Sequence, residues 1–168
     1  MGMFLNDEQE KLAHGIAAQL IARDETVAVA EGTAGGLISA ALLSVAGASR
    51  YYAGGGVVYT LGSRTALAGV PPEQYANYQG TTPEMLTSLA ESMRERLGAT
   101  WCIAESGLAG PTGGRFGAPP GRTTISVAGP VACTEVIETG LAGREANMVE
   151  FTTRSLLFLN NAIREAKG

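Results

Sequence analysis

The residues best suited to chemistry lie in one short turn, residues 30–36, which reads AEGTAGG. The turn directly follows the largely apolar run 26–29 and precedes a helix-like apolar segment, 37–43. A strand, a tight glycine turn and a helix together present backbone N–H groups to anionic ligands in α/β proteins. We therefore expect this turn to bind a ligand. The binding residues expected here are Glu31, Gly32, Gly35 and Gly36.

A second glycine-rich loop, residues 107–117, follows the strand-like apolar residues 101–104. Ligands of open α/β sheets bind outside the carboxyl ends of the strands, so both glycine segments are expected to face one pocket. The loop lacks the Gly-Lys-Ser/Thr ending of a Walker P-loop, which argues against an ATPase. A flexible surface loop is the alternative interpretation. The binding residues expected here are Ser106, Gly107, Gly110, Gly113 and Gly114.

Hydrophobic periodicity and helix-capping residues predict the elements that position these loops. In chain order they are a helix at 7–23, a strand at 26–30, a helix at 37–45, a strand at 51–59, a helix at 63–68, a helix at 83–97, a strand at 101–104, an antiparallel pair at 123–128 and 134–137, and a helix at 144–165. Helices alternate with strands first, and a hairpin comes late. This order predicts a single three-layer α/β/α domain over residues 1–168, with a mixed, mainly parallel sheet.

Two of these elements carry further expectations. The strand at 51–59 contains three consecutive glycines, 54–56, which predicts close approach by another backbone or by a ligand. The helix at 83–97 begins with Thr82 as a capping hydroxyl and Pro83 in its first turn. The residues expected on its buried face are Met85, Leu89, Met93 and Leu97.

Composition and charge exclude several classes of function. The formal net charge is −4 and no window is rich in Lys or Arg, which argues against nucleic acid as the main partner. The longest nearly apolar stretch, 37–48, is too short to span a bilayer, and the polar residues 6–8 are not typical of a signal peptide. Cys102 and Cys133 lack CxxC spacing and are expected to be free thiols in a cytoplasmic protein. No cluster has metal-ligand spacing.

Five segments, in order along the chain, together resemble one protein family. They are residues 30–31 with 35–36, then 45–49 (VAGAS), 56–59 (GVVY), 67–70 (LAGV) and 106–114 (SGLAGPTGG). These segments are similar to the C-terminal domain family of the competence/damage-inducible protein CinA, and the similarity extends from the first predicted helix to the last. It implies the α/β fold predicted above. Stand-alone members of this family are nicotinamide-mononucleotide deamidases, which release ammonia and leave the carboxylate.

The resemblance also implies roles for particular residues, and two of them differ here. The family's turn usually reads Glu-Ser-Cys-Thr-Gly-Gly with the serine as nucleophile, and Gly32 stands at the serine position. The tyrosine of its next motif is present as Tyr59, but the following lysine, a proton acceptor, corresponds to Arg64. Glycine has no nucleophilic side chain, and arginine stays charged where lysine can act as a neutral base. Deamidase activity is therefore expected to be weak or lost.

Three residues remain candidates for catalytic roles, each with a structural alternative. Thr33 is either a displaced nucleophile or the cap of the following helix. Tyr59 and Arg64 are either a surviving acid/base and anion clamp, or an edge tyrosine and a solvated arginine. Glu31 is expected to hold the shape of the turn rather than to transfer a proton.

Two functions from different classes remain open. The first is an amidohydrolase that acts on nicotinamide mononucleotide or a similar pyridine nucleotide, with Thr33 or a directly activated water in place of the serine. Glu105 and Ser106 are an alternative base and hydroxyl pair, although adjacent strand residues point to opposite faces. The second function is a paralogue that binds a nucleotide or a partner protein without turnover. No cofactor or metal is implied by either function, and the glycine-rich strand with Tyr51 and Tyr52 is expected to form a homo-oligomer interface.

Overall fold

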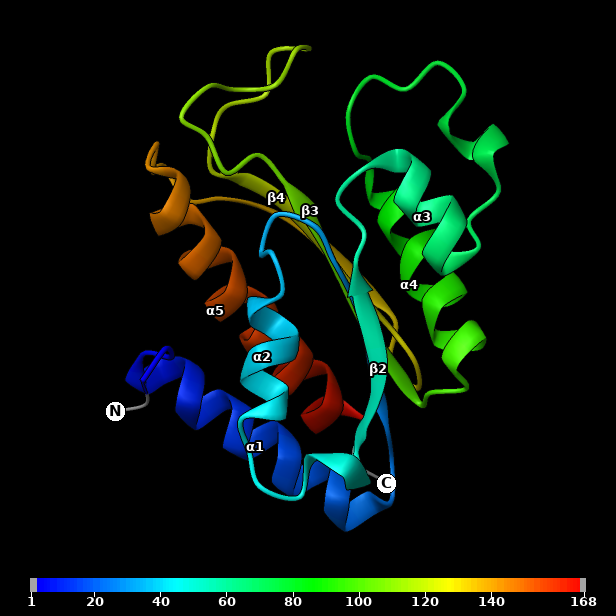
Figure 1. Cartoon of the computed structure of the whole chain (residues 1–168), viewed down its shortest axis with the longest axis vertical. Helices are drawn as coiled ribbons and strands as arrows, with labels where there is room; N and C mark the ends of the chain where they lie inside the picture. Colours follow the sequence, from blue (N-terminus) through cyan, green and yellow to red (C-terminus); the bar gives the residue numbers. More distant parts are fainter. Residues whose placement is uncertain (1–2, 167–168) are drawn as a thin grey trace.

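The computed structural model describes residues 3–166, and one mixed β-sheet lies at its centre (Figure 1). The strands are β1 (Val27–Glu31), β2 (Tyr52–Val57), β3 (Trp101–Gly107), β4 (Arg122–Ala128) and β5 (Cys133–Glu138), in the spatial order β2-β1-β3-β4-β5. β1 pairs in parallel with β2 and β3, whereas β4 is antiparallel to β3 and to β5. The predicted mixed sheet is confirmed, and its parallel pairings are confined to the half formed by β2, β1 and β3.

Helices cover both faces of this sheet, which confirms the predicted three layers. One face carries α1 (Asp7–Arg23), α2 (Leu37–Leu43) and α5 (Arg144–Glu165), and the other carries α3 (Leu61–Ala68) and α4 (Pro83–Leu97) (Figure 1). Short 3₁₀ turns lie at Ala48–Arg50 and Pro72–Tyr75. Alternate residues of β1 enter the two cores, because successive strand side chains point to opposite faces. Val29 packs in the first core and Ala28 in the second.

Side-chain caps fix where two of the helices begin. The Asn6 side chain accepts a hydrogen bond from the Gln9 N–H, and the Gln9 side chain accepts one from the Asn6 N–H. This reciprocal pair is a capping box at the start of α1. Thr82 accepts from the Met85 N–H and Pro83 occupies the first turn of α4, as the sequence predicts.

The buried face of α4 differs from the predicted one. Met85 is only half-buried and Leu97 is 38% exposed, so both were placed wrongly. A spacing of four residues drifts off a helix face, because one turn contains about 3.6 residues. The buried residues instead follow the three- and four-residue spacing of a packed face. They are Leu86, Leu89, Ala90 and Met93.

The glycine-rich strand β2 is an edge strand, and the predicted close approach occurs at Gly55. Gly55 pairs with Val29 of β1, and a Cβ atom added at Gly55 would overlap the Val29 carbonyl oxygen. The approaching group is therefore the backbone of the neighbouring strand. Because glycine has no side chain, β2 can lie this close to β1.

Tyr51, just before β2, and Tyr52, its first residue, do not form a surface pair. Tyr51 is fully buried, and its hydroxyl donates a hydrogen bond to the Leu42 carbonyl oxygen. The Tyr52 hydroxyl, at the margin of the same core, lies 2.8 Å from Ser39 Oγ. Placing Tyr51 in a subunit interface was therefore wrong, since the core already covers it. The homo-oligomer itself stays a prediction.

We expect Gly55→Ala to destabilise the protein and Gly62→Ala not to do so. The methyl group at position 55 meets the Val29 backbone, and overpacking of this kind costs about 1–3 kcal/mol of unfolding free energy. At Gly62, in the first turn of α3, an added Cβ meets nothing within 4 Å, and alanine favours the helix by up to about 1 kcal/mol. Urea unfolding followed by circular dichroism measures both variants. Equal unfolding midpoints would contradict the close approach of β2 to β1.

Candidate functional site

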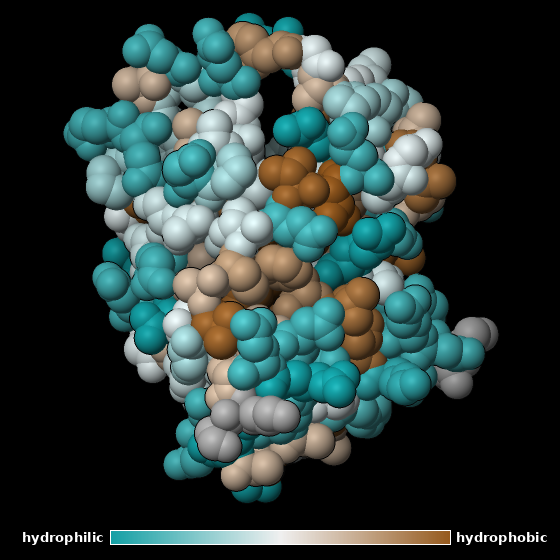
Figure 2. Space-filling model, turned by 180° about the vertical axis from the view of Figure 1, so that it is seen from behind, coloured by the Kyte–Doolittle hydropathy of each residue, from teal (hydrophilic) through white to brown (hydrophobic). Residues whose placement is uncertain are grey.

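A cavity of about 820 Å³ lies at the edge of the sheet where the parallel strands β1, β2 and β3 end. Its walls come from the turn after β1, the start of α3, the loop before α4, the end of β3 and the glycine loop that leads to β4 (Figure 1). Seen from behind, an opening separates two lobes at the upper end of the molecule (Figure 2). Both glycine segments therefore contribute residues to one cavity, in agreement with the sequence.

The cavity wall contains part of the predicted site. The predicted residues that line it are Thr33, Tyr59, Arg64, Ser106, Gly107, Gly113 and Gly114. Those that lie outside its wall are Glu31, Gly32, Gly35, Gly36 and Gly110. The wall also contains residues that sequence reasoning missed, among them Tyr78, Thr81, Phe116 and Thr123. Phe116 belongs to the second glycine loop, whereas no spacing or capping pattern connected Tyr78, Thr81 and Thr123 to either glycine segment.

The carboxylate of Glu31 occupies the start of α2. One of its oxygens accepts from the Gly36 and Ile38 N–H groups at 2.9 and 3.0 Å, and the other accepts from the Ser39 N–H at 2.9 Å. The positive end of the helix is thus neutralised by the protein's own anion. Glu31 holds the shape of the turn, as expected. The Gly36 N–H is already used within the protein and does not point to a ligand.

Thr33 does not cap the following helix, so the structural alternative given for it was wrong. The N-cap of α2 is Gly36, which has no side chain to cap with. The Thr33 hydroxyl instead donates to Glu105 Oε2 and accepts from the Gly107 N–H at 3.0 Å. It thereby ties the first glycine turn to the end of β3. Its side chain also reaches the cavity wall, with only 7% of the residue exposed.

Glu105 is a fully buried carboxylate in β3. The strand continues past its predicted end at residue 104, because Glu105 and the two residues after it pair with β4. Oε1 accepts from the Ala34 N–H at 2.8 Å, and Oε2 accepts from the hydroxyls of Thr33 and Thr123. Burial raises the pKa of Glu105 above its ordinary value, and the hydrogen bonds from Thr33, Ala34 and Thr123 oppose that shift.

Arg64 is buried, so the alternative of a solvated arginine was wrong. The residue is 2% exposed, and its Nη2 donates to Ser106 Oγ at 2.5 Å. Its guanidinium carbon lies 5.9 Å from the centre of the Tyr75 ring, within cation–π range. Nη1 is buried without a hydrogen-bond partner, and within residues 3–166 no carboxylate forms an ion pair with Arg64. The described part of the chain therefore offers no counter-charge in contact with this buried cation at the cavity wall.

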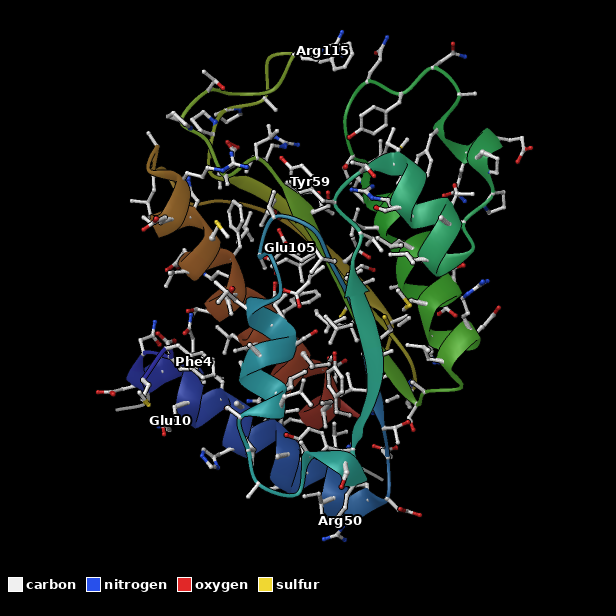
Figure 3. All side chains as sticks on the ribbon, viewed as in Figure 1. Phe4, Glu10, Arg50, Tyr59, Glu105 and Arg115 are labelled. Atoms are coloured by element: carbon white, nitrogen blue, oxygen red, sulfur yellow. The ribbon has the colours of Figure 1, made fainter. Side chains whose placement is uncertain are left out.

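Two residues near the start of α5 hold the second glycine loop in place. Asn147 is fully buried, and its Nδ2 donates to the carbonyl oxygens of Ala109 and Leu141 at 2.8 and 2.9 Å. Arg144 Nη1 donates to the Gly110 carbonyl oxygen at 2.7 Å. Its Nη2 lies 3.4 Å from the hydroxyl of Tyr59. The Tyr59 residue is 56% exposed and lies below the loop that carries Arg115 (Figure 3). Sequence reasoning missed Asn147, although a buried amide in an apolar helix face indicates such an anchor.

Metal binding, thiol chemistry and membrane crossing have little support among the described residues. Among residues 3–166 no group of three or more His, Cys, Asp or Glu side chains has the arrangement of a metal site. Cys102 and Cys133 are free thiols, as predicted, and burial raises the pKa of both. In the same part of the chain, none of the helices has the length and apolar character that a membrane crossing requires. The polar chemistry of the site therefore rests on hydroxyls, the carboxylates of Glu105 and Glu138, and arginines.

We expect Glu105→Gln to change how stability depends on pH. A carboxyl group whose pKa is raised by folding favours the folded state at low pH, and that contribution is lost as the pH rises through the folded pKa. The amide keeps the size of the side chain but does not ionise. The stability of the variant relative to wild type should therefore increase with pH, with a slope of at most about 1.4 kcal/mol per pH unit. Thermal unfolding between pH 4 and 8 measures the difference, with the exposed Glu138→Gln as control. A flat difference, or one that falls with pH, would contradict the raised pKa.

Known proteins show the same fold and sequence pattern. The family model "CinA C-terminal domain" matches residues 9–163. A CinA-like protein of Prochlorococcus marinus is 39% identical over 79% of this chain and 31% of its own length, and one of Acidobacterium capsulatum is 38% identical over 82% and 33%. The chain thus spans about a third of these curated relatives.

The crystal structure of the competence/damage inducible protein CihA from Agrobacterium tumefaciens matches with a TM-score of 0.89 at 25% identity, over 98% of this chain and 99% of that one. The CinA superfamily protein of Enterobacter cloacae gives 0.86 at 26% identity, over 97% and 98%. Agreement of the family model over nearly the whole described chain leads to one conclusion: the chain belongs to the CinA C-terminal domain family.

Proposed function

We propose that this protein binds a small anionic pyridine nucleotide in the cavity, and that its deamidation of nicotinamide mononucleotide is weak or lost. The observation that carries the proposal is the buried guanidinium of Arg64, whose Nη1 has no partner among residues 3–166. A buried charge without a counter-charge costs free energy, and an anionic ligand is the group that offsets this cost. Arginine also remains protonated at any physiological pH, so it binds an anion rather than accepting a proton.

The position of Gly32 supports loss of the nucleophile. A Cβ atom added there would lie 3.3 Å from the Glu105 carbonyl oxygen and 3.7 Å from Ser106 Cβ. A serine side chain would press on the Glu105 carbonyl oxygen, which must shift by a few tenths of an ångström, and it would lie next to Ser106, which Arg64 contacts. The two departures from the family pattern are thus neighbours in space. One removes a hydroxyl, and the other replaces the base that would have activated it.

The rest of the cavity suits a nucleotide. Its volume of about 820 Å³ lies within the range of small-molecule sites, which is about 300–1,000 Å³. Tyr59, Tyr78 and Phe116 line it and can stack on a heteroaromatic ring. Arg115, at the tip of the glycine loop, and Arg122, which pairs with Glu138 at 3.7 Å, are exposed cations in the wall (Figure 3). They can contact a phosphate group.

A second candidate function is an amidohydrolase in which Thr33 has become the nucleophile. The observation that favours it is the hydrogen bond from the Thr33 hydroxyl to the buried Glu105 carboxylate at the cavity wall. A hydroxyl beside a carboxylate of raised pKa is a nucleophile and base pair in principle. The same bond also holds the turn against β3 and β4, because Thr123 and Ala34 donate to that carboxylate as well.

Ammonia release and ligand binding separate the two candidates. We expect wild-type protein to bind nicotinamide mononucleotide or its deamidated form saturably in calorimetry, while releasing no ammonia above background. Thr33→Val removes the hydroxyl at nearly constant shape, and Thr33→Ser retains it. Turnover that is lost in Thr33→Val and kept in Thr33→Ser would establish the second candidate. Absence of both binding and turnover would overturn the proposal.

A paired substitution tests whether the two departures act together. We expect Gly32→Ser alone to leave ammonia release at background, because Arg64 cannot accept the serine proton. Gly32→Ser combined with Arg64→Lys supplies both a hydroxyl and a base, so it should release ammonia measurably above Arg64→Lys alone. Equal rates in the single and double variants would show that these positions do not account for the weak activity.

The predicted cytoplasmic location and homo-oligomeric state also remain part of this proposal.

A further inference from the structure

We infer that the buried end of this cavity selects a carboxylate over a carboxamide, so that the protein binds the deamidated acid form of its pyridine nucleotide more tightly than the amide form. The inference rests on the proposed function and adds to it which form of the ligand is held. Four observations carry it: an unneutralised charge, a pair of adjacent donors, the absence of an internal competitor and the location of the other cations.

The first observation is the state of Arg64. Its side chain is almost completely removed from solvent, and its Nη1 has no partner in the described part of the chain. A neutral carboxamide oxygen can accept a hydrogen bond from Nη1 but leaves the positive charge uncompensated. A carboxylate supplies both the acceptor and the opposite charge, so it adds an ion pair to the hydrogen bond that either form of the ligand can accept from arginine. The buried charge therefore favours the acid.

The second observation is the hydroxyl beside the guanidinium. Ser106 Oγ accepts from Arg64 Nη2 at 2.5 Å, so its hydroxyl proton is donated to an acceptor other than Arg64. The other hydroxyl near it is that of Thr81, at the longer distance of 3.5 Å. Arg64 and Ser106 both line the cavity and contact each other, so the guanidinium and the Ser106 hydroxyl are neighbouring donors, which suits the two oxygens of a carboxylate. A carboxamide has only one acceptor oxygen for these two donors, and its N–H₂ group cannot face the guanidinium, which has donors alone.

The third observation is that the nearby acidic side chains are engaged elsewhere. Glu105, adjacent to Ser106 in sequence, directs its carboxylate to Thr33, Ala34 and Thr123. Glu138, which also lines the cavity, pairs with Arg122 at 3.7 Å. Neither forms an ion pair with Arg64 within residues 3–166. The counter-charge therefore has to come from the ligand.

The fourth observation concerns the phosphate of a nucleotide, which is the alternative anion for Arg64. Arg115 and Arg122 are exposed, whereas Arg64 is buried against Tyr75. A phosphate carries three oxygens and more charge than the donors at Arg64 can satisfy, and it keeps more of its hydration at the exposed arginines. We therefore assign the planar carboxylate to Arg64 and the phosphate to the outer wall.

Calorimetric titrations with nicotinate mononucleotide and nicotinamide mononucleotide test the assignment, because the two ligands differ only in the carboxylate. Wild-type protein should bind the acid about tenfold or more tightly, in the range of one charge-assisted interaction. Arg64→Met keeps the length of the side chain without its charge, and should bring the two affinities to within about twofold of each other. Arg154→Met, which removes an exposed arginine of α5 paired with Glu150, should leave the preference intact.

Each result bears on the inference separately from the proposed function. Equal affinities in wild type, or a preference that persists in Arg64→Met, would overturn carboxylate selection while leaving nucleotide binding in place. An equal loss of affinity for both nucleotides in Arg64→Met would place the phosphate at Arg64 and also overturn it. Failure of wild type to bind either nucleotide would overturn the proposed function itself. Thermal unfolding of Arg64→Met checks its fold, and we expect it to melt no lower than wild type because a buried charge has been removed.

Discussion

The hydrogen bonds to the buried carboxylate of Glu105 are the interaction on which the site depends. They join the turn after β1, through Thr33 and Ala34, to β4, through Thr123. Glu105 itself belongs to β3, which lies between those two strands. A single side chain thus sets the relative position of three segments that end at the cavity. Low polarity around it strengthens each of these bonds, and it also makes any unsatisfied partner costly.

Arg64 is buried like Glu105, but its hydrogen-bonding groups are not all paired. Among residues 3–166, Glu105 has several hydrogen-bond donors, whereas the guanidinium of Arg64 lies at the cavity wall with one nitrogen unpaired. Groups of this kind reduce stability and are retained at sites where a ligand completes the interaction. The tyrosine ring near Arg64 offsets part of this cost through the cation–π contact. The unpaired buried charge therefore lowers the free energy of unfolding below the value that the packing of the two cores alone would give.

Rules that depend on neighbouring residues predicted much of the fold. Contacts between residues far apart in the sequence could not be predicted in this way. The helix starts at Asn6 and Thr82 follow from capping rules, and the alternation of β1 follows from strand geometry. The environment of Thr33 could not be read in this way, because its partner Glu105 is 72 residues distant. Burial of Arg64 depends similarly on Ser106 and on the loop before α4. Long-range contacts decided which candidate residues face the cavity, and no periodicity encodes them.

The carboxylate of Glu31 completes the hydrogen bonds of the first glycine turn before any ligand binds. In many phosphate-binding folds the helix start is completed only when the ligand arrives. Here an internal anion already fills that position, so the turn has its final hydrogen bonds in the free protein. Ligand association need not reorganise this turn, and less entropy is lost on association. Fragment soaking and rigid-receptor docking on the free protein are therefore appropriate on this side of the cavity.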